Sequence, residues 1–132
     1  MKYVLFFLVI LISIYPKKKE PKIKNCDSLL EKYQPVRNLT KKPFVKINFK
    51  LSDYYPNEAK KKNIRKGESS LRVFIDKKGN LACYTIIKKS EQKEFDEAAI
   101  KIIKKAKYKA GEINSSPVDS YVVFPIHFSL DE

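Results

Sequence analysis

The chain has 132 residues, of which 43% are hydrophobic and 12% aromatic, so it has room for one domain with an ordinary core and is not disordered throughout. Its formal net charge of +13 suggests nucleic-acid binding, but the positive charge is unevenly distributed along the chain. Residues 16–50 hold 11 basic and 3 acidic side chains, and residues 51–132 hold 16 basic and 12 acidic side chains. A basic linker attached to a more balanced domain argues against nucleic acid as the partner.

The chain opens with an apolar segment. Residues 3–15 are apolar except for Ser13 and lie between Lys2 and the triplet Lys17–Lys19. A run of about 13 residues fits the core of a signal peptide better than a membrane span, which needs about 20. Because no pair of small residues follows as a cleavage site, a short uncleaved membrane anchor remains the alternative. Residues 1–15 are therefore predicted to export or anchor the protein.

Residues 16–43 are rich in lysine and proline and are predicted to form a tether. Such a segment is a solvated spacer or a contact for anionic lipid or cell-wall polymer. Within it, residues 26–33 could form a brief helix. After export Cys26 could pair with Cys83, although Cys83, in an expected strand, could equally be a small buried hydrophobic residue.

The folded domain is expected over residues 44–132. Residues 44–51 alternate between apolar and polar side chains, which predicts an extra strand at the start of the domain. A helix should follow from Pro56 to about Asn63, because proline is well placed in a first helical turn.

A hairpin is predicted next, with strands at 68–76 and 81–88 joined by a turn from Asp76 to Asn80. Residues 94–107 carry apolar side chains at helical spacing, with Ser90 as the expected cap and acidic residues at the positive end of the helix dipole. Residues 111–117 are predicted to be a loop, and alternation resumes in a final strand that includes Val122, Phe124 and Ile126.

This order of elements places the last strand at an edge of the sheet. A helix of that length can recross the sheet, so the last strand should run parallel to the second strand of the hairpin. An edge strand offers unpaired main-chain groups to which an extended peptide can add as a further strand. The candidate site is the run of residues at the start of this strand: Ser120, Tyr121, Val122, Val123 and Phe124.

Within this run Tyr121 and Val123 should face away from the core and meet partner side chains, and Pro125 should limit the ladder. In the alternative interpretation Pro125 protects the edge against aggregation and the strand 44–51 covers it.

Catalytic chemistry is not indicated. His127 is the single histidine and has no recognisable serine or cysteine partner, and the two cysteines lie too far apart in sequence for metal-ligand spacing. Asp96 and Glu97 are adjacent in a helix, so their side chains diverge, and we interpret them as dipole-stabilising residues. With only three glycines, the chain has no glycine-rich phosphate loop, and no cofactor is predicted.

The ordered set of marker residues from Tyr55 to Leu130 resembles the TonB C-terminal domain family. The markers are Tyr55-Pro56 with Ala59, Gly67, the turn from Asp76 to Asn80, Phe95-Asp96-Glu97-Ala98-Ala99, Pro117-Val118, and Phe124-Pro125-Ile126-His127-Phe128. The resemblance implies an α+β fold, a small three-stranded antiparallel sheet with two helices as in TonB and TolA, possibly with an extra N-terminal strand.

In function, the resemblance implies a periplasmic interaction module linked to outer-membrane transport. Its partner would be a short segment of an outer-membrane receptor or another envelope protein, added at the edge strand. It does not extend to the membrane segment of energy transducers, because residues 3–15 lack the histidine found there. The alternative function is a tethering protein of the cell envelope, whose basic linker contacts anionic lipid or cell wall without energy transduction.

Overall fold

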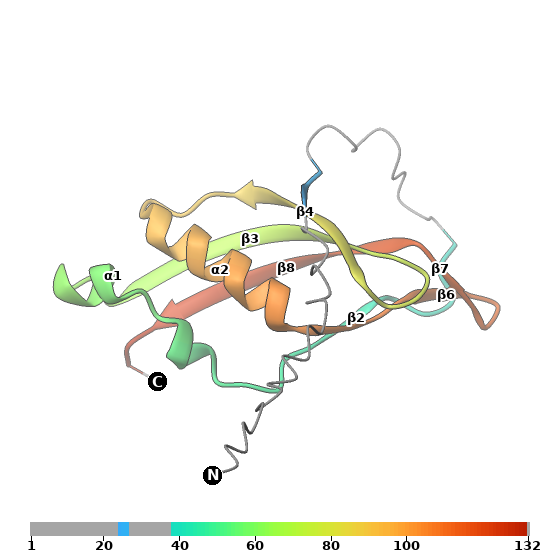
Figure 1. Cartoon of the computed structure of the whole chain (residues 1–132), viewed down its shortest axis with the longest axis horizontal. Helices are drawn as coiled ribbons and strands as arrows, with labels where there is room; N and C mark the ends of the chain where they lie inside the picture. Colours follow the sequence, from blue (N-terminus) through green and yellow to red (C-terminus); the bar gives the residue numbers. More distant parts are fainter. Residues whose placement is uncertain (1–23, 27–37, 132) are drawn as a thin grey trace, which may run out of the picture.

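The computed structural model describes residues 24–26 and 38–131 (Figure 1). The predicted signal peptide or anchor, most of the predicted tether and all but the first residue of the predicted helix at 26–33 lie outside this part. None of the helices in the described residues is long and apolar enough to cross a membrane.

The domain is built on a four-stranded sheet in the order β1-β4-β3-β8. The strands are β1 (Lys24–Asn25), β3 (Lys66–Ile75), β4 (Leu81–Lys88) and β8 (Ser120–Ser129). Strands β4, β3 and β8 are antiparallel neighbours, and β1 adds to β4 in parallel. The predicted α+β fold is confirmed, and β1, which was not predicted, is an additional N-terminal strand of this sheet.

The β3–β4 hairpin closes through its predicted turn. The Asp76 carboxylate accepts hydrogen bonds of 2.9 Å from the backbone N–H groups of Lys78 and Asn80. Gly79 has a φ of 82°, a conformation that side chains with a Cβ rarely adopt. Turn chemistry readable from the sequence therefore sets the register of the hairpin.

One face of the sheet is covered by α2 (Lys93–Lys105), and the short α1 (Asn57–Lys61) follows a 3₁₀ turn, η2 (Leu51–Tyr54), beside it (Figure 1). Phe95 of α2 is fully buried, with its ring centroid 5.4 Å from that of Tyr55 and 5.1 Å from that of Phe128. This aromatic cluster joins α2, the segment before α1 and the last strand into one core.

The start of α2 differs from prediction. The N-cap is Gln92, not Ser90, and its side chain makes no capping bond. The Ser90 hydroxyl instead accepts a hydrogen bond of 3.4 Å from the Gln92 N–H. Ser90 thus organises the turn before the helix and leaves the cap position to Gln92.

The strand predicted at 44–51 is shorter than expected. Only β2 (Phe44–Lys46) is a strand, and it pairs with β5 (Lys107–Lys109) in a separate two-stranded sheet. The predicted alternation nevertheless holds, because Ile47 and Phe49 pack against the core while Asn48 and Lys50 are exposed. The pairing stops early because β5 offers three residues.

The loop predicted at 111–117 is a small hairpin, and that prediction was wrong. Strands β6 (Gly111–Ile113) and β7 (Ser116–Val118) pair in antiparallel fashion through a two-residue turn. Both turn residues, Asn114 and Ser115, have positive φ angles, of 47° and 69°. Such angles suit the tight two-residue turns that match strand twist, but serine is an unusual residue there.

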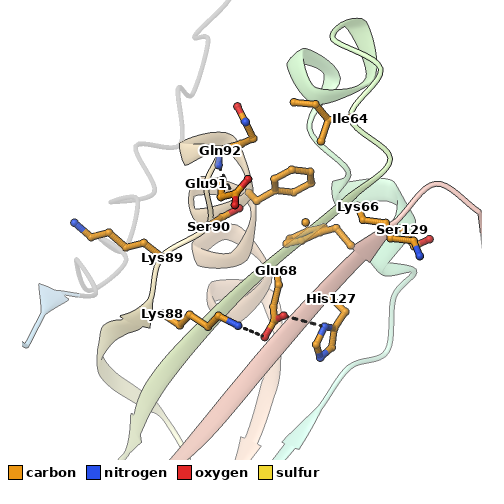
Figure 2. A pocket seen from close by; sticks show the side chains of 13 residues that line it. Ile64, Lys66, Glu68, Lys88, Lys89, Ser90, Glu91, Gln92, His127 and Ser129 are labelled. Atoms are coloured by element: carbon orange, nitrogen blue, oxygen red, sulfur yellow. Dashed lines mark hydrogen bonds and ion pairs between the residues drawn. The ribbon is translucent and has the colours of Figure 1, made fainter.

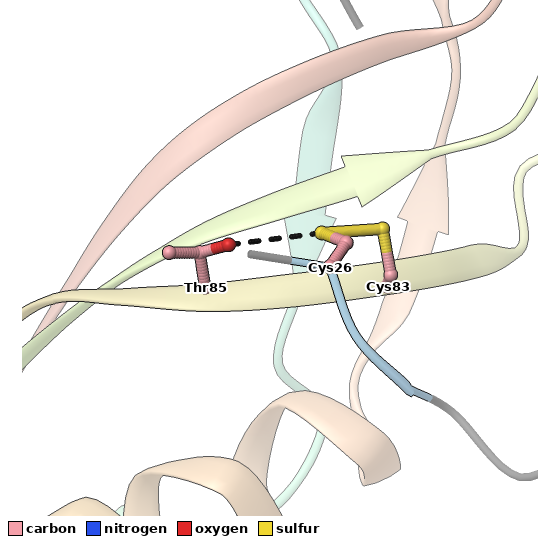
Figure 3. The surroundings of a disulfide bond; sticks show 3 residues. All are labelled: Cys26, Cys83 and Thr85. Atoms are coloured by element: carbon pink, nitrogen blue, oxygen red, sulfur yellow. Dashed lines mark hydrogen bonds between the residues drawn. A yellow bond between two sulfur atoms is a disulfide. The ribbon is translucent and has the colours of Figure 1, made fainter. Parts of the chain in front are cut away.

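The face of the sheet opposite α2 carries a disulfide bond between Cys26 and Cys83, whose Cα atoms are 5.5 Å apart (Figure 3). Cys26 follows β1 and donates its backbone N–H to the carbonyl of Tyr84 at 3.0 Å. Both cysteines are buried and form a small cluster with Phe74, against which Tyr121 packs. Residues 24–26, inside the predicted tether, are thereby joined to the sheet.

Candidate functional site

The candidate binding edge is the outer side of β8. β8 pairs with β3 along its whole length, from Ser120 opposite Ile75 to Ser129 opposite Lys66. It is the last strand in the order of the sheet, and within the described part of the chain no strand pairs with its other side (Figure 1). The predicted edge position and direction of the last strand are confirmed.

The strand expected to cover this edge lies elsewhere. β2 pairs with β5 from Phe44 opposite Lys109 to Lys46 opposite Lys107, and the main-chain groups of residues 40 and 41 bond to those of Glu112 in β6. Residues 38–46 therefore run along the β5–β6 segment and use their main-chain groups there. The covering role of residues 44–51 is overturned by this pairing.

The five predicted site residues lie in sequence along the first half of β8, in different surroundings. Ser120 is buried, and its hydroxyl accepts a hydrogen bond of 3.0 Å from the backbone N–H of Gly111. Val122 and Phe124 are partly buried and pack against the core on the helix side. Ser120, Val122 and Phe124 therefore hold the strand in place with their side chains.

Tyr121 and Val123 face the other way, as predicted. The ring centroid of Tyr121 lies 5.7 Å from that of Phe74, and the Arg72 guanidinium lies 5.1 Å above the Tyr121 ring. Tyr121 is thus fixed by the sheet and half-buried, whereas 45% of Val123 is exposed. Of the two, Val123 is the freer to meet an added strand.

A shallow hollow of about 300 Å³ adjoins this part of β8. It is lined by Ser120, Tyr121, Val122 and Val123 on one side and by Leu39, Lys42 and Pro43 on the other. Phe124 does not line it. The structure thus brings four of the five predicted residues to one concave surface, next to a segment that the sequence did not connect with them.

A larger groove of about 550 Å³ lies at the other end of β8 (Figure 2). Glu68 stands on its floor, 3.3 Å from the Lys88 ammonium and 3.8 Å from His127 Nδ1. The His127 side chain is 70% exposed, so solvent screens these contacts and they contribute little to stability. The expectation of a solvated histidine agrees with this geometry.

Asp96 has a role that the sequence did not reveal. It is buried at 9% exposure, and its Oδ1 accepts hydrogen bonds from the Ser69 hydroxyl at 2.7 Å and from the Ser90 N–H at 2.9 Å. It therefore ties α2 to β3 and to the preceding turn, whereas the adjacent Glu97 is exposed. Ser69 and Ser90 gave no separate sequence signal for these bonds.

Glu94 occupies the first turn of α2 as predicted. The hydrogen bond from its own backbone N–H lowers the pKa of this carboxyl, and the nearby Lys62 ammonium, 3.6 Å away, lowers it further. Among residues 24–26 and 38–131 no group of three histidine, cysteine, aspartate or glutamate side chains is placed to hold a metal ion.

The sequence of this domain matches a known family model. Residues 52–130 match the model described as Gram-negative bacterial TonB protein C-terminal, which covers more than half of the chain. No curated protein and no solved structure matched the chain. The matched range begins within the 3₁₀ turn and ends just after β8, so it includes the whole candidate edge.

Proposed function

The chain belongs to the family of Gram-negative bacterial TonB protein C-terminal domains, and from this premise we propose that it binds an extended segment of an envelope protein by strand addition at β8. Domains of this family are periplasmic, non-enzymatic and tied to the inner membrane, and they interact with envelope proteins such as outer-membrane receptors. The proposal adds the place and the mode of binding.

The proposal rests on the two sides of β8: the inner side is hydrogen-bonded to β3, and the outer side pairs with no strand in the described part of the chain. All ten residues of β8 have a partner on β3, so the strand is held in an extended conformation by one neighbour. An extended peptide that adds to the other side gains main-chain hydrogen bonds without any rearrangement of the sheet. Five residues, Ser120–Phe124, offer roughly 17 Å of strand.

Pro125 indicates which main-chain groups face the partner. In an antiparallel pair, alternate residues direct their N–H and C=O groups to the same neighbour. Proline in a strand is accommodated where its missing N–H would face away from the paired strand. By this parity, Tyr121 and Val123 point their main-chain groups outward, and Val122 and Phe124 point theirs at β3.

Side chains on the outer face give the added strand its specificity. Val123 is 45% exposed and Tyr121 presents the free part of its ring beside the 300 Å³ hollow. These surfaces are apolar, and Lys42 stands at the opposite wall of the hollow. The preferred segment is therefore extended, with small apolar side chains at alternate positions and an acidic residue near Lys42.

The test separates main-chain from side-chain recognition. Labelled peptides that cover the N-terminal periplasmic segments of the organism's outer-membrane receptors are titrated with the full chain, and binding is followed by fluorescence anisotropy. Val123→Pro removes an outward N–H, whereas Val123→Thr keeps every main-chain group. Val122→Pro removes an inward N–H and is the control for damage to the β3 ladder.

We expect Val123→Pro to keep the wild-type circular dichroism and melting curve and to lose peptide binding, and Val123→Thr to bind within about a few-fold of wild type. Val122→Pro should destabilise the fold through its lost ladder bond. Unchanged capture by the folded Val123→Pro variant, or failure of every receptor peptide to bind wild type, would overturn the proposal.

A further inference from the structure

The two-stranded sheet of β2 and β5 carries a basic face with one exposed aromatic ring. Directly opposed residues in an antiparallel pair have side chains on the same face. Phe44 lies opposite Lys109 and Lys46 lies opposite Lys107, so these four side chains form one face, which we call the basic ribbon face. All four are exposed, and the exposure of Phe44 reaches 59%.

The opposite face of this sheet fixes it to the domain. Val45 and Tyr108 oppose each other there and are partly buried. The Tyr108 hydroxyl donates a hydrogen bond to the carbonyl of Ile103 in α2, and its ring packs against the core. The basic ribbon face is thus held on a rigid support and points to solvent.

The charges of this face are not balanced locally. Lys46 and Lys107 are directly opposite each other, an arrangement of like charges that destabilises a strand pair. Within the described residues, the ion pairs of the domain involve other cations, and none includes Lys46, Lys107 or Lys109. Lys77 and Lys78 line a hollow of about 170 Å³ together with Lys109 and add two further cations, and the one acidic residue in this lining, Glu112, pairs with Lys41.

Neither the lysines nor the ring is explained by packing. Phe44 is absent from the buried core. Because its ring stays in contact with water, it does not contribute the stabilisation that a buried phenylalanine gives to the fold. Both features are accounted for together at the surface of an anionic membrane, where lysines approach lipid phosphates and an aromatic ring enters the boundary between headgroups and acyl chains.

We propose that the basic ribbon face docks the domain on a membrane surface that contains anionic phospholipid. An acidic polymer without aromatic groups would satisfy the lysines but would leave the ring of Phe44 without an apolar environment, which favours lipid. Bases of a single-stranded nucleic acid would stack on the ring, but domains of this family are periplasmic and tied to the inner membrane, so lipid is the anionic surface nearest to them. None of the four residues of this face belongs to β8 or lines the hollow beside it, so the inference does not depend on the function proposed above.

The test uses a reporter that the chain lacks. The sequence has no tryptophan, so Phe44→Trp introduces a single indole at the centre of the proposed contact. The full chain with this change is reconstituted with vesicles of phosphatidylcholine, or of phosphatidylcholine and phosphatidylglycerol in equal parts. We expect a blue-shifted indole emission, quenched by brominated acyl chains, with the anionic vesicles only, and a return to the aqueous emission at about 1 M salt.

Two triple variants, both made in the Phe44→Trp background, locate the charges responsible. Lys46→Gln with Lys107→Gln and Lys109→Gln removes the lysines of the face, and Lys60→Gln with Lys89→Gln and Lys93→Gln removes three exposed lysines near α1 and the start of α2. The first triple should weaken lipid contact on the order of 100-fold, from about fivefold per lysine, and the second by less than about threefold.

Three outcomes would overturn the inference: equal emission shifts with neutral and anionic vesicles, equal losses in the two triple variants, or no shift at all. A further variant, Lys17→Gln with Lys18→Gln and Lys19→Gln, distinguishes the folded surface from the tether. If it abolishes the shift while the ribbon triple leaves the shift intact, the contact belongs to the tether and the inference fails.

Discussion

The hydroxyl of Ser69, on β3, donates a hydrogen bond of 2.7 Å to the carboxylate of Asp96, on α2, and both groups are buried. Because the same carboxylate oxygen accepts the N–H of Ser90, one side chain connects the helix, the sheet and the turn between them. Its removal leaves two donors without a partner in a place that water reaches poorly.

We therefore expect Asp96→Ala to lower the free energy of unfolding by about 1–3 kcal/mol, the cost of leaving buried donors unsatisfied. Urea denaturation of the wild type and the variant measures this difference in the free energy of unfolding. Glu97→Ala is the matched control, because Glu97 is the exposed neighbour in the same helix, and its effect should stay within about 0.5 kcal/mol. Equal effects of the two substitutions would contradict a structural role for Asp96.

The disulfide between Cys26 and Cys83 closes a loop over a sequence separation of 57. On the chain-entropy account, a loop of that size stabilises the fold by about 4 kcal/mol. Reduction should lower the urea midpoint of the wild type to that of the Cys26→Ser, Cys83→Ser double variant, and the double variant should not respond to reductant. Alkylation of both thiols in the native, unreduced protein would show that the bond is absent.

Gly67 is packed against the ring of Phe95, where a Cβ atom would lie 2.5 Å from the ring carbons. Gly67→Ala should therefore cost about 1–3 kcal/mol through overpacking. In a Phe95→Leu background the penalty for the same change should shrink, since the smaller side chain leaves room. The thermodynamic cycle of the four proteins tests this, and a penalty of equal size in both backgrounds would exclude the contact as its cause.

Stability should fall in alkaline solution in part through Tyr108. Burial raises the pKa of its phenol above the value of about 10 that it has in an unfolded chain. The protonated phenol therefore stabilises the fold fully below about pH 10, and this contribution is lost as pH rises towards the folded-state pKa.

Tyr108→Phe should cost about 1 kcal/mol at neutral pH through the lost bond to Ile103. Above about pH 10 the gap between the two proteins should narrow, because only the wild type has the phenol to ionise on unfolding. Urea denaturation of both proteins at several pH values across this range measures the difference. A difference that stays constant with pH would contradict a raised pKa of Tyr108 in the folded protein.

The elements that the sequence predicts well carry their own local signals. Asp76 and Gly79 specify the turn of the β3–β4 hairpin. The apolar spacing at 94–107 lies within two residues of the observed bounds of α2, and the alternating residues Val122, Phe124 and Ile126 all lie in β8. The candidate edge followed from their order, because a helix that recrosses the sheet leaves the last strand on the outside.

The features that were missed depend on contacts between distant segments. β1 has two residues and pairs with β4 beside a disulfide, which no local pattern reveals. The Asn114-Ser115 turn lacks the glycine that usually marks such a hairpin. Asp96 resembled a helix-dipole residue because its partner Ser69 lies 27 positions away in sequence.

The Cys26–Cys83 bond also sets a length. If residues 1–15 hold the chain in the inner membrane, the eight residues from 16 to 23 connect the lipid to β1, and eight residues reach roughly 26–29 Å at full extension. Once the bond is reduced and β1 leaves β4, the next residue that the structure fixes in the domain is residue 38, and the 22 residues from 16 to 37 span at most roughly 73–79 Å. With such an anchor, the oxidation state of one buried bond sets the greatest distance from the membrane at which the proposed β8 edge can meet a partner.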